Sequence, residues 1–252
     1  MKRFSFGSLR VRLILLVLLT VIPALGITFY SGLEHREQMR QHALDDALRL
    51  AKDISEDHDH LIQNARQILF TLSQMPQVRQ HDAAVCSKIF TNLLKQSRGF
   101  ANFGAVKPNG DVFASAHPIT QPVNFADRPW FQRAVKTRDF IIGEYLIGRI
   151  INKALVTLAY PVLDEGGQLN AVLFAGLDLE WLNKTAGKSK LQEGTSVSVI
   201  DSNGTILFRY PEPEKFVGKS MPEASIVKAM LAKHTGVEET RSWKHPKGWM
   251  VF

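Results

Sequence analysis

The apolar positions at the start of the chain predict a membrane anchor. Residues 13–33 contain no charged side chain, and a helix of this length crosses a hydrocarbon core of about 30 Å. Residues 1–12 carry Lys and Arg but no acid, which predicts a cytoplasmic amino terminus and an exported remainder. We therefore expect a transmembrane helix in the lipid bilayer of the inner (plasma) membrane, with the bulk of the chain periplasmic or extracellular. The alternative is a signal peptide cleaved after Gly26, but the apolar run continues past that residue and favours an uncleaved anchor.

The next segment, 34–75, changes to a helical pattern. It contains neither glycine nor proline, and Pro76 follows it, which predicts one long helix that ends there. Apolar or small residues recur in it with steps of three and four, and His58 fills the gap as a polar register residue. These positions are Leu44, Ala47, Ala51, Ile54, Leu61, Ala65, Ile68, Leu72 and Met75. We expect a stalk whose distal half packs on the globular part. Two alternatives stay open for the rest of the helix: it forms a homodimer seam near the membrane, or it packs only against its own domains.

Beyond Pro76 the pattern predicts a mixture of helices and strands. In order, it indicates a helix near 83–97, a hairpin of strands 100–106 and 111–116, a short helix from 128, strands at 140–151, 154–163 and 171–179, and a short helix that contains Trp181. Asn109-Gly110 between two apolar runs is a strong hairpin signal. The turn at 164–167 separates the second and third strands of the later group.

Part of this pattern occurs twice. The hairpin at 106–113 aligns with residues 200–207, and at the same spacing the helix at 128–136 falls on 222–230. A strand-like run follows each copy. The repeat predicts an α+β fold of two tandem units, each an antiparallel sheet with helices on one side. We place a membrane-distal unit at 76–186 and an incomplete membrane-proximal unit at 187–252, and we expect the natural protein to continue past Phe252.

Composition mainly excludes functions. The 252 residues carry a formal charge of +7, but their Lys and Arg form no basic stripe beyond the amino terminus, so we expect no nucleic-acid partner. The single cysteine, Cys86, has no partner for a disulfide or a metal site. The histidines lack metal-ligand spacing, and no nucleophile elbow, phosphate loop or dinucleotide fingerprint is present. We expect no catalytic residue, metal or cofactor in this segment.

Candidate binding chemistry gathers between 124 and 182. Arg128 offers a planar fork that fits a carboxylate, although a surface ion pair is its alternative. Trp130 and Phe131 either wall a pocket or belong to the core. Asp178 lies in an otherwise apolar run, so it should be paired, lie at a rim or cap the following helix.

The order and spacing of these features resemble the double Cache (dCache, tandem PAS-like) sensor domains of bacterial membrane receptors. The markers are Asp127–Phe131, Ala159–Val162 before a glycine turn, and Leu177–Leu179, together with the anchor and the long helix. The resemblance implies tandem PAS-like units, and an output domain of a histidine kinase, diguanylate cyclase or chemoreceptor after a second membrane helix.

The resemblance also implies a ligand site. Arg128 matches the family's ligand arginine, Asp178 the aspartate that takes a ligand amine, and Tyr145 a further contact, so we expect Arg128, Trp130, Phe131, Tyr145 and Asp178 to bind ligand. Two family contacts are missing: Val123 replaces a tyrosine, and Ile147 replaces an aspartate. The expected ligand is therefore a small carboxylate or an amine or amino-acid-like molecule.

Two functions from different classes follow. The first is an extracytoplasmic small-molecule sensing module of a signal-transduction receptor, non-catalytic itself even where the whole protein is a kinase or cyclase. The second is a structural or periplasmic protein-interaction module that binds no small ligand.

Overall fold

The computed structural model describes residues 59–186, 196–233, 237–240 and 248–251, together with separate positions between 13 and 56. Residues Met1–Arg49 and Leu50–Phe252 form two separate units. No helix in the described part of the chain is both long and apolar enough to cross a bilayer. Most of the predicted anchor at 13–33 and of the predicted stalk before residue 59 lies outside the described residues.

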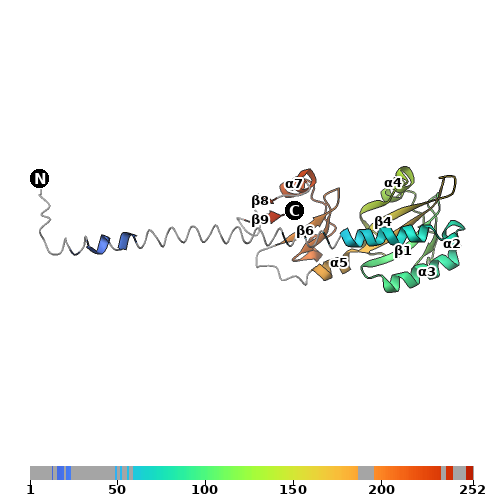
Figure 1. Ribbon diagram of the computed structural model, residues 1–252, viewed down its shortest axis with the longest axis horizontal. Helices are drawn as coiled ribbons and strands as arrows, with labels where there is room; N and C mark the ends of the chain where they lie inside the picture. The colour runs from blue at the N-terminus through green and yellow to red at the C-terminus, as the bar shows by residue number, and fades with distance from the viewer. Residues whose placement is uncertain are drawn as a thin grey trace. The chain divides into compact units, whose positions relative to one another are not determined.

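The distal unit is built on a five-stranded antiparallel sheet, visible on the right of Figure 1. Its strand order is β2-β1-β5-β4-β3. The strands are β1 Phe100–Val106, β2 Val112–Ser115, β3 Ile141–Ile147, β4 Ala154–Leu163 and β5 Leu169–Asp178. The hairpin and the three later strands are confirmed, and β3 lies at an edge of the sheet.

Helices cover both faces of this sheet, so the prediction of helices on one side is wrong. The helix at 59–73, α2 (Pro76–Arg79) and α3 (Ala83–Gln96) pack on one face, and α4 (Pro129–Thr137) packs on the other (Figure 1). Each face therefore has its own apolar cluster. Leu69, Phe90 and Phe103 are fully buried on the first face, and Phe125 and Trp130 are buried on the second.

Local sequence explains where these helices begin and end. Asp82 accepts a hydrogen bond from the Val85 amide at 3.1 Å and so caps α3. Pro129 occupies the first turn of α4, where its missing N–H costs nothing, and Arg138 ends the helix in the left-handed conformation. Pro76 does more than stop the long helix, because that helix ends at residue 73 and Pro76 opens α2.

The proximal unit begins with a hairpin of β6 (Val197–Ile200) and β7 (Ile206–Tyr210), followed by α6 (Pro213–Phe216), α7 (Ser225–Lys233), β8 (Val237–Thr240) and β9 (Gly248–Val251). The repeat of the hairpin is confirmed in its hydrogen bonds. Lys107 N donates to Asp111 O at 2.8 Å, and Asp201 N donates to Thr205 O at 2.9 Å, in matching turns. The described strands of this unit pair as β6-β7 and β8-β9, in two separate sheets.

Candidate functional site: a cavity under helix α4

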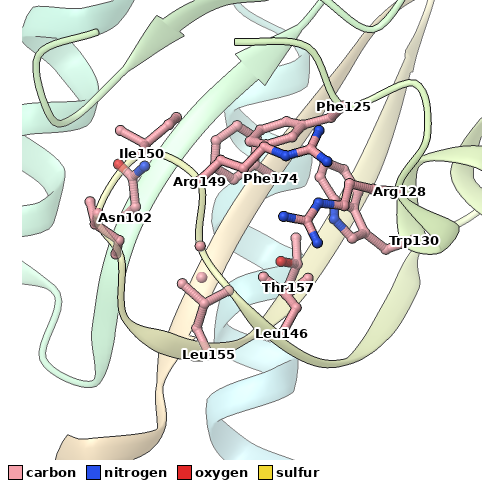
Figure 2. A pocket seen from close by; sticks show the side chains of 13 residues that line it. Asn102, Phe125, Arg128, Trp130, Leu146, Arg149, Ile150, Leu155, Thr157 and Phe174 are labelled. Carbon is pink, nitrogen blue, oxygen red and sulfur yellow. The ribbon is translucent and has the colours of Figure 1, made fainter. Parts of the chain in front are cut away.

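A small cavity lies on the α4 face of the distal sheet (Figure 2). Its volume is about 30 Å³, which is room for about one or two water molecules. The sheet supplies one wall, and the chain between β3 and β4 supplies another. Its lining is Asn102, Phe125, Arg128, Trp130, Leu146, Gly148, Arg149, Ile150, Ile151, Leu155, Thr157, Phe174 and Gly176.

Arg128 enters the cavity from the residue before α4. One terminal nitrogen of its guanidinium donates to the carbonyl oxygen of Ile147 at 3.4 Å, which is long for such a bond. Its Nε is buried and has no hydrogen-bond partner among the described residues. Burial lowers the pKa of Arg128, and the neighbouring charge of Arg149 lowers it further. An anion in the cavity would relieve both effects.

Arg149 is the second guanidinium of the cavity, and it is already paired. It makes a bidentate contact with Asp127 at 2.7 and 2.6 Å, and it donates to the carbonyl oxygen of Asn124 at 2.6 Å. The hydrogen bond from Arg149 lowers the pKa of Asp127 to about 2. The alternative for Arg128 was a surface ion pair with Asp127 or Asp139. Among the described residues Asp127 pairs with Arg149 instead, and the carboxylate of Asp139 lies 4.0 Å from the guanidinium of Arg66. The lining thus contains two guanidinium groups and no carboxylate.

Aromatic rings form the apolar wall of the cavity. Trp130 is 2% exposed, and its ring centroid lies 5.4 Å from that of Phe125 and 5.8 Å from that of Phe174. Figure 2 shows the two guanidinium groups beside these rings. Phe131 packs against Trp130 at 5.9 Å in the core and is not part of the lining.

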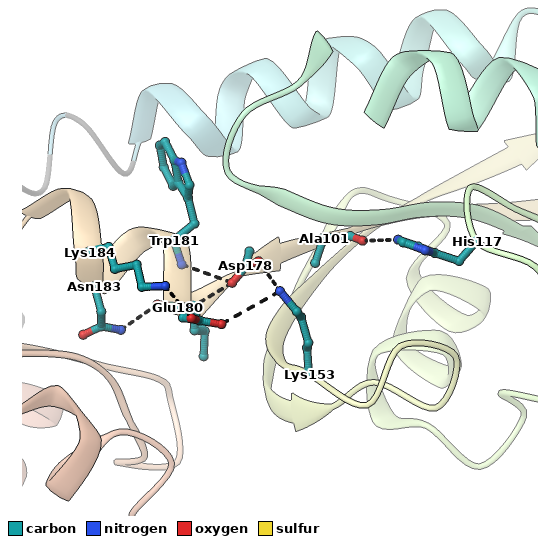
Figure 3. Close-up of polar contacts among 9 residues, drawn as sticks. Ala101, His117, Lys153, Asp178, Glu180, Trp181, Asn183 and Lys184 are labelled. Atoms are coloured by element: carbon teal, nitrogen blue, oxygen red, sulfur yellow. Dashed lines mark hydrogen bonds and ion pairs between the residues drawn. The ribbon is translucent and has the colours of Figure 1, made fainter. Parts of the chain in front are cut away.

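Asp178 lies outside the cavity lining and caps a helix (Figure 3). Its Oδ1 accepts hydrogen bonds from the amides of Glu180 and Trp181 at 2.9 and 3.1 Å, at the start of α5 (Leu179–Ala186). Its Oδ2 lies 3.3 Å from the Nζ of Lys153. Asp178 therefore caps α5, which is the alternative that the sequence left open. Its second carboxylate oxygen pairs with the ammonium group of Lys153.

Tyr145 also lies away from the cavity, on the opposite face of the sheet. Successive side chains of a strand point to opposite faces, and Leu146 lines the cavity while Tyr145 packs against the core of the other face. A Cβ added at Gly218 of the proximal unit would lie 2.5 Å from the Tyr145 hydroxyl oxygen. As ligand contacts, the five predicted residues stay predictions. The structure brings Arg128 and Trp130 together in one cavity and places the other three elsewhere.

Three polar residues of the cavity were missed from the sequence. Arg149 carries a charge within the apolar run at 140–151, which is the same kind of signal that drew attention to Asp178. Asn102 and Thr157 are each 3% exposed and face the cavity from β1 and β4. Neither has a sequence signal, because a single polar residue in a strand is common.

The described part of the chain thus contains a five-stranded α+β unit with a cationic cavity under α4, followed by a second unit with a matching hairpin. The chain matches the family model of the Cache domain, in its dCache_1 form, over residues 35–252. The chain therefore belongs to the Cache domain family.

Among curated proteins, the chain is similar to sporulation kinase D of Bacillus subtilis (strain 168). The two are 24% identical over 197 residues, which cover 78% of this chain and 38% of the kinase. The chain thus spans well under half the length of that relative.

Solved structures show the same fold. The extracellular domain of a protein named as the histidine kinase rpHK1S-Z16 matches with a TM-score of 0.74 at 16% identity, and the match covers 83% of this chain and 88% of that domain. The ligand-binding domain of the Campylobacter jejuni chemoreceptor Tlp3, in complex with L-valine, has a TM-score of 0.58 at 15% identity, with coverages of 81% and 84%. At these identities the likeness concerns the fold alone.

Proposed function

We propose that this chain is the sensing module of a membrane signalling receptor, and that its distal unit binds a small carboxylate that carries no ammonium group. One observation carries the proposal: among the described residues, the cavity lining contains two guanidinium groups and no carboxylate, and the buried Nε of Arg128 has no acceptor. Arg128 would hold the carboxylate, and Trp130 would form the apolar wall beside it.

The partners of Asp178 favour an acid over an amino acid. A ligand ammonium needs an acceptor, and the family's acceptor position is occupied here by two backbone amides and by Lys153. The Tlp3 domain with L-valine shows that this fold holds a molecule with a carboxylate. In this chain the ammonium group of Lys153 would take the place beside Asp178 that the ammonium group of a bound amino acid takes in the family. An amino acid would therefore bind no more tightly than the acid that lacks its amino group.

The cavity must enlarge to hold such a ligand. A cavity of about 30 Å³ has room for about one or two water molecules, which is too little for an organic acid. The segment 148–153 joins β3 to β4 and supplies Arg149, Ile150 and Ile151 to the lining. We propose that this segment moves outward on binding, because the sheet wall opposite is part of the buried core.

The receptor context rests on the family and on the similarity to a sporulation kinase. We propose a plasma-membrane protein that dimerises through the long helix and passes the signal to a cytoplasmic kinase, cyclase or chemoreceptor module. For any signal to pass, the ligand must bind two arrangements of the helix with unequal affinity.

The test is calorimetric titration of the full chain in lipid nanodiscs with propionate, L-alanine and propylamine, which share a carbon skeleton. We expect propionate to bind at least as well as L-alanine and propylamine not to bind. Arg128→Ala should abolish propionate binding, and the matched control Arg98→Ala, an exposed arginine, should not change it. Preference for L-alanine, or binding unaffected by Arg128→Ala, contradicts the proposal.

A second function is favoured by the small volume of the cavity. If no small acid or amine from a wider metabolite panel shifts the melting temperature of the chain, the distal unit is a structural or protein-interaction module. Crosslinking the intact receptor in cells would then identify a periplasmic protein on the α4 face, and Arg128→Ala would leave that crosslink unchanged.

A further inference from the structure

A second cavity, of about 470 Å³, lies where the distal sheet, the helix at 59–73 and the proximal hairpin meet. Ligand pockets in proteins span roughly 300–1,000 Å³, so this cavity is within the range for a small organic molecule. It is far larger than the cavity beside Arg128, and it shares no lining residue with it.

Its walls are mostly apolar and come from both units. They include Leu61 of the long helix, Val156 and Leu177 of the distal sheet, Leu182 of α5, and Val199 and Leu207 of the proximal hairpin. An occupant would therefore lose apolar surface to water on several sides at once. At roughly 25 cal/mol per Å² of buried apolar surface, that is the main source of affinity for such a site.

Two of the three charged side chains that line this cavity, Arg133 and Asp201, already have partners, and the third, Asp59, is exposed to solvent. Arg133 lines it and lies 2.9 Å from Glu144, and it donates to the carbonyl oxygen of Ile142 at 2.7 Å. Asp201 also lines it, and its carboxylate accepts hydrogen bonds from the amides of Tyr145, Asn203 and Thr205. A charged ligand would gain no unpaired partner from these two residues.

One donor is left over. The Nε of Arg133 is buried and has no hydrogen-bond partner among the described residues. A buried donor without an acceptor is rare and costs free energy, so it calls for an explanation. A neutral oxygen acceptor satisfies this donor without disturbing the pair with Glu144.

We propose that this junction cavity is a second ligand site, which binds a neutral, mostly apolar small molecule with one carbonyl oxygen directed to Arg133. The occupant contacts both units together, so its binding stabilises their association. The site is independent of the carboxylate site, because none of its residues surrounds Arg128. It gives the domain a second chemical input, of opposite character to the first.

The test uses thiol labelling of the full chain in nanodiscs, in a Cys86→Ala background that removes the single native thiol. Ser202 and Ser220 are both exposed residues of the proximal unit, but only Ser202 lines the cavity, so Ser202→Cys places a thiol at its rim and Ser220→Cys places one outside it. The probes are 4-acetylbenzyl methanethiosulfonate, which is apolar with one ketone, and a trimethylammonium methanethiosulfonate. We expect the ratio of apolar to cationic labelling rates to be about tenfold higher for Ser202→Cys, as burial of an aromatic ring implies. Equal ratios at the two positions overturn the proposal.

Two further arms test the cavity and the donor. Val199→Phe and Ile62→Phe fill the cavity from opposite walls, and each should return the Ser202→Cys ratio to that of Ser220→Cys. A ratio that persists in both variants means that the label lies elsewhere. Replacing the ketone by an isopropenyl group should slow labelling, and Arg133→Lys, which keeps a cation for Glu144 but removes Nε, should erase that difference. No ketone advantage in the unaltered Arg133 background overturns the assigned ligand class.

Discussion

The backbone amide of Tyr145 in β3 donates a hydrogen bond to Oδ2 of Asp201 in the proximal unit, at 3.1 Å. The other oxygen, Oδ1, accepts from the amides of Asn203 and Thr205 at 2.9 and 2.8 Å. Asp201 is only 8% exposed. A single buried carboxylate therefore closes the proximal hairpin turn and ties it to the strand that carries Leu146 and the Ile147 carbonyl to the Arg128 cavity.

Asp201→Asn should weaken this link and leave the turn intact. The amide keeps one oxygen for the turn amides but presents an NH₂ group to the Tyr145 N–H, so a buried donor loses its acceptor. We expect a loss of about 1–3 kcal/mol in the free energy of unfolding, measured by urea denaturation and tryptophan fluorescence. Asp164→Asn is the matched control, because Asp164 accepts two amides in an exposed turn of the distal unit, and its side chain makes no hydrogen bond to the described residues of the proximal unit. Equal losses in the two variants would show that the Tyr145 bond contributes nothing.

The strands were predictable because their apolar runs are long and end at turn residues. β4 has the predicted bounds, Ala154–Leu163, and the turn after it falls at Asp164–Gly167. The continuous apolar run at 171–177 also indicates that helices cover both faces of the sheet, whereas the prediction placed them on one side. A strand with one exposed face alternates, whereas an unbroken run indicates burial on both faces, as helices on both sides of β5 produce.

The site was less predictable, because it depends on pairings across long sequence separations. A bulge between Ile142 and Tyr145 shifts the register of β3 against β4, and its one local sign is Gly143, which does not by itself fix which side chains face the cavity. This register decides that Leu146, and not Tyr145, faces the cavity. Likewise, the pairing of Asp127 with Arg149 removes one partner from Arg128, and only the folded chain brings those two residues together.

The Asp127–Arg149 pair predicts a specific acid response. The folded pKa of Asp127 is about 2, below its ordinary value of 3.8, so the pair stabilises the fold above pH 3.8 and loses this contribution as pH falls toward 2. Asp127→Asn lacks the ionised form at every pH. We expect the stability difference between the native chain and Asp127→Asn to be constant from neutral pH to about 5 and to shrink between about pH 4 and 2. Unfolding free energies of both proteins across this range measure it, and a difference that does not change with pH would rule out the pair as its source.

The cap at Asp178 predicts different effects for two substitutions. Asp178→Ala removes the acceptor for the Glu180 and Trp181 amides and should cost about 0.5–2 kcal/mol of stability. Asp178→Asn keeps one oxygen for the cap and loses only the charge opposite Lys153, so its cost should be a few tenths of a kcal/mol up to about 1. Thermal or urea unfolding gives both values.

Asp178→Asn also tests whether Asp178 helps to select the ligand. If the cavity takes a carboxylate without an ammonium group, Asp178→Asn should leave the ratio of propionate to L-alanine affinity unchanged. A selective loss of L-alanine binding in this variant would instead return Asp178 to the ligand site. Lys153→Met controls for the loss of the ion pair alone.

Gly218 predicts where the Tyr145 ring lies. Gly218 has φ +81°, and a Cβ there would meet the Tyr145 hydroxyl at 2.5 Å, so Gly218→Ala combines backbone strain with a steric overlap. Gly167 has φ +73° and nothing within 4 Å of an added Cβ, so Gly167→Ala measures the strain alone, roughly 1–2 kcal/mol. We expect Gly218→Ala to cost about 1–3 kcal/mol more than Gly167→Ala, and the excess to disappear in a Tyr145→Ala background. If the excess persists without the ring, the Tyr145 side chain does not pack against Gly218 of the proximal unit.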